Sequence, residues 1–247
     1  FLLYAFFFPK AAQGPLCRYG EFSAQLDARA VTADNLNAGV TRLIFGLGKK
    51  ALLSSAAGAI AQETFSLPSS ALSPVYAWTG AICYALQIYF DFSGYTDLAL
   101  GLALLFGFTL PENFDHPYMA NSVTDFWRRW HMSLSGWFRD YLYIPLGGNR
   151  RGTLRTMCNK LLVFLATGLW HGNGLTFVLW GLWHGLWSCV ETALHLPKKL
   201  ERKWYGHVYT LLVVIFGFAL FRAASPAQGF ALWRAMLTGF HADNVCR

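Results

Sequence analysis

Histidine can exchange a proton near neutral pH, and three histidines of this chain lie in apolar or aromatic surroundings. His171 follows Trp170 within the sequence GLWHG at residues 168–172, and His131 follows Trp130. A neutral imidazole held beside a hydroxyl group can accept its proton, so we take His171 and His131 as candidate catalytic residues. His184 has a similar Leu-Trp-His-Gly context, and a structural role explains it as well as a chemical one.

Common catalytic signatures are missing from the sequence. It contains no GxSxG, HExxH, P-loop or dinucleotide-binding motif, which disfavours the usual serine hydrolases, zinc proteases and nucleotide-binding enzymes. The five cysteines, which include Cys246, lack CxxC spacing. We therefore expect neither a disulfide framework nor a bound metal ion.

The composition indicates a membrane protein. Apolar residues make up 55% of the 247 residues and charged residues only 13%. No charged residue occurs in residues 64–90, 161–190 or 204–221, and the first two of these segments exceed the roughly 20 residues that a helix needs to cross a bilayer. We expect a span beginning near Pro74, a short second one over 98–110 and a last one over 204–221, while 39–62 is either a span or a half-buried helix.

Glycines interrupt the segment 161–190 in the middle. Gly168, Gly172 and Gly174 surround His171 and Asn173, and glycine weakens a helix. Broken backbone is tolerated at membrane depth only where it is buried in protein or lines a wet cavity. We therefore expect a helix–loop–helix here, with His171 facing a cavity.

The net charge of +7 comes from basic clusters beside the apolar segments, and these clusters form no recognisable nucleic-acid-binding motif. Such clusters usually stay in the cytoplasm, which places 150–160 and 198–203 on that side. Because both clusters flank the segment 161–190, that segment must cross the membrane twice or form a re-entrant loop in it. Asp91 and Asp97 lie at membrane depth and are either functional, paired with cations, or caps of helix ends.

Residues 121–152 have the pattern of one amphipathic helix. Ser122 and Asp125 resemble a capping box, and apolar residues then recur at intervals of three and four. These residues are Trp127, Trp130, Leu134, Trp137 and Tyr141. The helix is expected in or near the membrane interface, either as an aromatic belt or as part of a site, and the turn 143–150 should end it.

Five motifs resemble the membrane-bound O-acyltransferases. They are DFSGYTD at 91–97, PENF at 111–114, FWRRWHMSLS at 126–135, RDYLYIPLGGNR at 139–150 and GLWHG at 168–172, which is similar to the histidine motif of that family. The turn 143–150 resembles the alginate O-acetylation branch more than the D-alanyl-transfer branch. The chain starts inside an apolar run without Met, so we interpret it as a fragment: one domain, 1–247, without N-terminal spans and with a truncated C-terminus.

The resemblance implies an all-α polytopic protein of the bacterial cytoplasmic (inner) membrane, with transmembrane and interfacial helices in a ring around a tunnel. His171 would be the essential residue and His131 would lie near the tunnel. An acetyl group from a cytoplasmic donor, acetyl-CoA, would pass to hydroxyls of an exported polysaccharide through an extracytoplasmic acetyltransferase partner. No cofactor would be bound.

Roles for the other residues follow as hypotheses. His171 would act as a general base or carry the acyl group itself. Arg128, Trp130 and Asp91 would contact substrate, and Asn173 or nearby backbone N–H groups would stabilise an oxyanion. Two alternatives stay open: transfer of D-alanine from a carrier protein to teichoic acid, and a non-enzymatic transporter in which the intramembrane histidines, Asp91 and Asp97 relay protons or ions.

Overall fold

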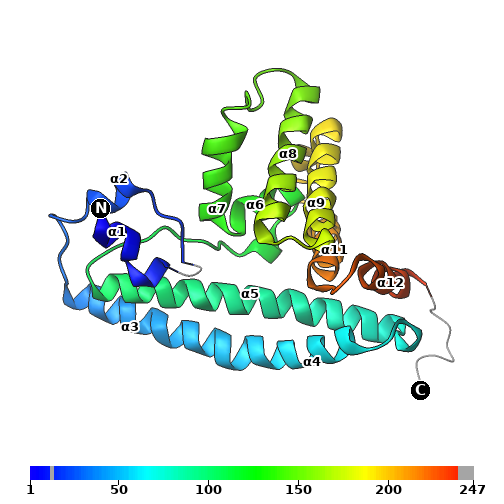
Figure 1. The fold of residues 1–247 in the computed structure, drawn as a ribbon, viewed down its shortest axis with the longest axis horizontal. Coiled ribbons are helices and arrows are strands. Elements are labelled where there is room, and N and C mark those ends of the chain that lie inside the picture. Colours follow the sequence, from blue (N-terminus) through cyan, green and yellow to red (C-terminus); the bar gives the residue numbers. More distant parts are fainter. Residues whose placement is uncertain (12–13, 239–247) are drawn as a thin grey trace.

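The computed structural model describes residues 1–11 and 14–238, and within these ranges the chain is helical without β-strands. A long helix runs through α3 (Ala33–Gly48), the π-helical segment η2 (Lys49–Ser54) and α4 (Ser55–Ser66). Helix α5 (Pro74–Leu105) returns antiparallel along its whole length, so the two form a long hairpin (Figure 1). Ser73 caps α5 by accepting a hydrogen bond from the Tyr76 N–H, and Pro74 fits its first turn.

Small residues let α3 and α5 approach closely. A Cβ atom added to Gly46 would lie 2.7 Å from the carbonyl oxygen of Gly94, and one added to Gly94 would lie 2.8 Å from that of Gly46. Gly39 and Gly101 make a second contact of this kind. Close backbone packing through small residues is the usual way in which apolar helices associate in a bilayer.

Asp91 and Asp97 lie inside α5, which is one continuous helix of 32 residues. The expectation of two spans separated at residues 91–97 is therefore wrong, as is the alternative that these aspartates cap helix ends. Lys49 Nζ lies 2.6 Å from Asp97 Oδ2, and Lys50 pairs with Asp91. The π turn of η2 lets these consecutive lysines both reach α5, and their charges offset the cost of two carboxylates in the helix.

The segment 121–152 forms two short helices instead of one. Helix α6 (Val123–Arg129) and helix α7 (Met132–Phe138) are separated at Trp130 and His131, and the π-helical segment η5 (Arg139–Tyr143) continues α7. The aromatic stripe is consequently divided: Trp130 is buried, whereas Trp137 and Tyr141 are exposed. Gly147 and Gly148, both with positive φ, form the expected turn after η5.

Helices α8 (Thr153–His171) and α9 (Leu175–Leu194) form a second hairpin beside α6 and α7 (Figure 1). The expected interruption of 161–190 is present at residues 172–174. After the short α10 (Leu196–Leu200), helix α11 (Trp204–Arg222) packs against α9 and α5, and α12 (Pro226–Leu237) packs on α11. The main apolar core joins α5, α6, α11 and α12, with Phe126, Phe218 and Leu232 almost fully buried.

The N-terminal part is made of short elements: α1 (Leu2–Phe6), η1 (Phe8–Lys10) and α2 (Tyr19–Ser23). Two 3-10 turns, η3 (Ser69–Ala71) and η4 (Pro117–Met119), lie in connecting segments. Within the described ranges, two helices are long and apolar enough to cross a membrane. These are the continuous helix Ala33–Ser66, with a mean hydropathy of 1.3, and Trp204–Arg222, with 1.7.

Candidate functional site

His171 is the last residue of α8, and the glycine-rich break follows it directly. Its imidazole is partly buried in an aromatic cage. The ring makes edge contacts with Trp180, at 5.1 Å between centroids, and with Phe221, at 5.2 Å. Because these rings come from α9 and α11, three helices fix the position of one imidazole.

His131 occupies the break between α6 and α7 and has a left-handed backbone, with φ of 45°. This conformation is uncommon for residues other than glycine, although asparagine, aspartate and histidine adopt it more often than the rest, and contacts of the neighbouring residues hold it here. Asn113, which is fully buried, supplies those contacts: its carbonyl accepts the Met132 N–H, and its Oδ1 accepts both the N–H and the hydroxyl of Ser133. The Phe92 ring packs edge-on against His131 at 4.7 Å.

His131 and His171 line the same two cavities. The first has a volume of about 210 Å³ and lies among α6, α7, η5, α8 and α9, and we call it the basic cavity. The second has a volume of about 460 Å³ and lies among the N-terminal segment, α5, α8 and α11, and we call it the aspartate cavity. Since both histidines contribute to both walls, the pair forms the partition between the two cavities.

The two cavities differ in charge. Three cations line the basic cavity, Arg128, Arg139 and Lys160, and no carboxylate is among the described residues around it. Arg139 pairs with Asp140, and Lys160 Nζ donates a hydrogen bond of 2.8 Å to the Thr192 hydroxyl. Among the residues that the structure describes, the aspartate cavity is lined by one charge of each sign, Lys10 and Asp91.

Other polar groups complete the basic cavity. The Thr167 hydroxyl donates to the Val163 carbonyl, one turn earlier in α8. Burial raises the pKa of the Tyr143 hydroxyl above its usual range, and the neutral hydroxyl can donate a hydrogen bond into the cavity. Lys160, Thr167 and Tyr143 were missed by sequence reasoning. A lysine eleven residues before His171, on the same face of one helix, was the signal that could have identified the first of them.

The predicted site residues are only partly brought together. Arg128 and Trp130 line the basic cavity with both histidines, and Asp91 lines the aspartate cavity with them. Asn173 is exposed and is not among the residues that line either cavity. His184 is fully buried next to the site, where its Nδ1 lies 3.4 Å from the indole nitrogen of Trp127.

No cluster suited to a metal ion is found among the described residues. Cys17, Cys83, Cys158 and Cys189 are free thiols, and Cys246 lies outside the described residues. The partition presents two imidazoles between a basic pocket and a mixed-charge pocket. Such groups can exchange protons with, or accept an acyl group from, reactants that enter from the two sides.

Comparison with known proteins gives consistent matches. The probable alginate O-acetylase AlgI of Pseudomonas putida is 42% identical over 96% of this chain, and the peptidoglycan O-acetyltransferase of Helicobacter pylori is 36% identical over 100% of it. The teichoic acid D-alanyltransferase of Bacillus subtilis is 30% identical over 89%. The chain covers 49%, 48% and 60% of the lengths of these relatives, respectively.

The profile of one enzyme family covers most of the chain, residues 1–225, which include both histidines, α6–α9 and every residue around the two cavities. These relatives transfer acyl groups, as their names state. The all-helical fold and its apolar helices agree with an enzyme that resides in a membrane. The chain therefore belongs to the membrane-bound O-acyltransferase family.

Proposed function

We propose that the protein is a multi-pass enzyme of the bacterial inner membrane that transfers an acetyl group from acetyl-CoA toward hydroxyls of an exported polysaccharide. The observation that carries this proposal is the partition: His131 and His171 each line two cavities of different charge. An acyl transfer between two aqueous phases needs such an arrangement, because donor and acceptor must reach one catalytic group from separate sides.

The basic cavity fits the acyl donor. Acetyl-CoA carries several phosphate charges, and Arg128, Arg139 and Lys160 offer positive charge without a lining carboxylate in the described chain. The basic segment 150–160, which includes the start of α8, contributes Lys160 to this cavity and, by the distribution of Lys and Arg, belongs on the cytoplasmic side, where acetyl-CoA is made. The aspartate cavity is then the route for the acceptor, either the polysaccharide or a partner acetyltransferase outside the membrane.

His171 would carry the chemical step. As a general base it takes the proton of the acceptor hydroxyl, whose oxygen attacks the thioester carbonyl carbon; the C–S bond then breaks, and the leaving thiolate takes the proton back from the imidazolium. In the second version, an imidazole nitrogen attacks the thioester first, releases the thiol and forms an acyl-imidazole, which the hydroxyl then cleaves. Both versions use the same residue and the same two cavities.

Transfer of acetate is preferred over transfer of D-alanine because the alginate and peptidoglycan O-acetyltransferases are more similar to this chain than the D-alanyltransferase, at 42% and 36% against 30% identity. The turn 143–150 supports the same choice. Supplying membranes with radiolabelled acetyl-CoA tests this directly, because a D-alanyl-transfer enzyme would leave the acceptor unlabelled.

The decisive experiment replaces His171 by Ala in the full-length protein, verifies insertion in the membrane, and measures polysaccharide O-acetylation in cells that lack the wild-type gene. We expect acetylation to be abolished. His195, which is exposed and lines neither cavity, serves as the control histidine, and it is replaced by Asn because its backbone is left-handed, with φ of 54°. Full acetylation by the His171→Ala protein would refute the proposed function. A hydroxylamine-labile label on the wild-type protein distinguishes the acyl-imidazole from the general base.

A further inference from the structure

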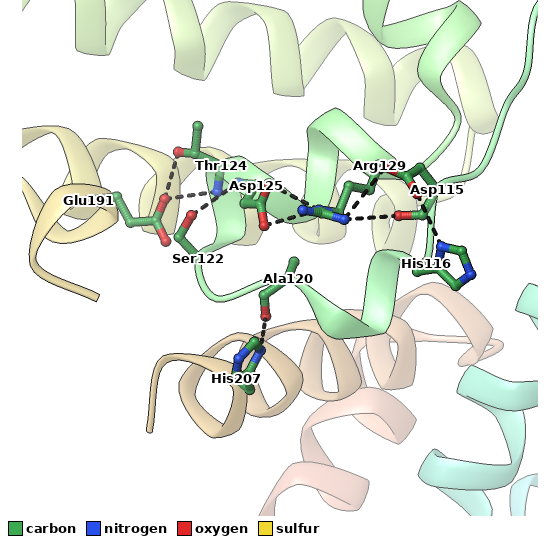
Figure 2. Close-up of polar contacts among 9 residues, drawn as sticks. All are labelled: Asp115, His116, Ala120, Ser122, Thr124, Asp125, Arg129, Glu191 and His207. Atoms are coloured by element: carbon green, nitrogen blue, oxygen red, sulfur yellow. Dashed lines mark hydrogen bonds and ion pairs between the residues drawn. The ribbon is translucent and has the colours of Figure 1, made fainter. Parts of the chain in front are cut away.

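Glu191 is a fully buried carboxylate on α9 that does not line either cavity. Its two oxygens accept three hydrogen bonds from the first two residues of α6. Oε1 lies 2.5 Å from the Val123 N–H nitrogen, and Oε2 lies 2.8 Å from the Thr124 nitrogen and 2.6 Å from the Thr124 hydroxyl. Figure 2 shows the side chain of Glu191 reaching from α9 to the start of α6 at Thr124.

Removing a carboxylate from water costs several kcal/mol unless hydrogen bonds and opposite charge compensate. Here two backbone N–H groups, a hydroxyl and the electrostatic attraction of Lys160 provide that compensation. An apolar residue at this position would leave the N–H groups of Val123 and Thr124 without this acceptor, so part of the role of Glu191 is to satisfy the first turn of α6. The carboxylate also fixes the position of α6 relative to α9, because its short charge-assisted hydrogen bonds hold the first turn of α6 against the Glu191 side chain.

The position of α6 matters because this helix carries much of the site. Trp127, Arg128 and Trp130 line the basic cavity, and His131 follows immediately. The far end of α6 is fixed independently by Asp115: the Arg129 carbonyl accepts the Asp115 N–H, and the Arg129 guanidinium pairs with the Asp115 carboxylate at 3.5 Å (Figure 2). Glu191 at the first turn and Arg129 at the last therefore hold α6 at both ends.

Glu191 also links the two histidine-bearing parts of the site. His171 packs against Trp180, which lies on α9, the same helix as Glu191. His131 is attached to α6, to which Glu191 is bonded. A shift of α6 along α9 would move His131 relative to His171 while leaving either histidine otherwise intact.

We propose that Glu191 is a positioning residue, which sets the placement of His131 and Arg128 opposite His171 through its hydrogen bonds to Val123 and Thr124. This inference rests on the proposed function, since it assigns Glu191 a part in the acyl transfer at the same site. Glu191 touches no reactant.

The test compares Glu191→Gln with Glu63→Gln in the full-length enzyme in membranes, with acetyl-CoA as donor. Glu63 is exposed on α4, so its substitution removes the same charge without touching the site. We expect kcat of Glu191→Gln to fall about ten- to a hundred-fold, the range for a misplacement of about 1 Å, with a much smaller change in KM. A purely structural role would instead lower the amount of active enzyme and leave the kcat of the folded fraction unchanged.

Thr124 provides a milder pair of variants in case Glu191→Gln does not fold. Thr124→Val removes one hydrogen bond to Glu191 and keeps the side-chain shape, and Thr124→Ser restores the hydroxyl. We expect Thr124→Val to lower kcat several-fold and Thr124→Ser to have a kcat close to that of wild type. A folded Glu191→Gln enzyme with the kcat of wild type would overturn the inference. If Glu191→Gln does not accumulate, the same result in Thr124→Val would overturn it. His171→Ala in the same assay separates the two claims, because activity in that variant refutes the proposed function itself.

Discussion

His131 and His171 lie far apart in the sequence and line the same two cavities. One belongs to a strained turn between α6 and α7, and the other ends α8 inside an aromatic cage. The Trp170 ring contacts both imidazoles: its centroid is 6.3 Å from that of His131 and 4.9 Å from that of His171. Because the two backbones are held by different elements, substitutions can perturb each histidine separately.

The left-handed backbone of His131 predicts different stabilities for two inactive variants. Asparagine tolerates this conformation better than most residues, whereas alanine bears a penalty of roughly 1–2 kcal/mol. Both His131→Asn and His131→Ala lose the imidazole, so we expect both to lose acetyl transfer, with Ala melting at a lower temperature than Asn. Thermal unfolding of the purified proteins in detergent provides the measurement. Equal melting temperatures would show that the turn is not strained.

The charge of the basic cavity predicts that Lys160 contributes to donor affinity. Lys160→Met removes a cation from the wall and keeps the length of the side chain, and we expect KM for acetyl-CoA to rise about tenfold, the equivalent of one charge-assisted hydrogen bond. Lys198→Met is the matched control, because Lys198 is exposed on α10 and lines neither cavity. A KM equal to that of the control would exclude Lys160 from the donor site.

The close crossing of α3 and α5 predicts opposite effects for two neighbouring glycines. A methyl group on Gly46 would lie 2.7 Å from the Gly94 carbonyl oxygen, so Gly46→Ala must separate the helices and should cost about 1–3 kcal/mol. Gly48 has open space at the corresponding position, and Gly48→Ala should stabilise the helix by about 0.5–1 kcal/mol. Melting temperatures of the two variants, measured side by side, check the sign of each effect. A Gly46→Ala protein as stable as wild type would mean that the helices are not packed this closely.

The sequence predicted those features that depend on local chemistry. Glycines around His171 weaken a helix wherever it lies, so the break between α8 and α9 could be expected, as could the turn containing Gly147 and Gly148. The serine cap of α6 could also be predicted, because capping is a local interaction, and Ser122 Oγ accepts the Asp125 N–H.

Features that depend on distant partners were predicted wrongly or missed. The three-and-four spacing after Ser122 fits one helix, and only the contacts of Asn113 with Met132 and Ser133 reveal why the chain turns at His131. The two aspartates inside the continuous helix α5 are likewise paired with residues far upstream, Asp97 with Lys49 and Asp91 with Lys50. Neither relationship has a periodic signature in the sequence.

The last prediction separates Asp91 from Asp97, which look equivalent in the sequence. The Asp97 side chain is 17% exposed and bonded to Lys49 and Arg42, whereas that of Asp91 is 44% exposed, pairs with Lys50 and lines the aspartate cavity beside both histidines. Asp97→Asn leaves Lys49 without its carboxylate and Arg42 with Glu112 alone, and it should lower the melting temperature clearly. Asp91→Asn breaks a more exposed pair, worth about 0–1 kcal/mol, and should leave stability nearly unchanged.

Activity should follow the opposite order when normalised to folded protein. We expect Asp91→Asn to reduce acetylation of the acceptor, because its carboxylate faces the proposed acceptor route, and Asp97→Asn to retain the kcat of wild type. Varying the acceptor concentration at saturating acetyl-CoA checks whether the loss in Asp91→Asn is one of acceptor KM. If Asp91→Asn keeps the acceptor kinetics of wild type, the only role of Asp91 is its ion pair with Lys50. Recognition of the acceptor would then depend on the other residues that line the aspartate cavity, among which Lys10 carries the remaining charge.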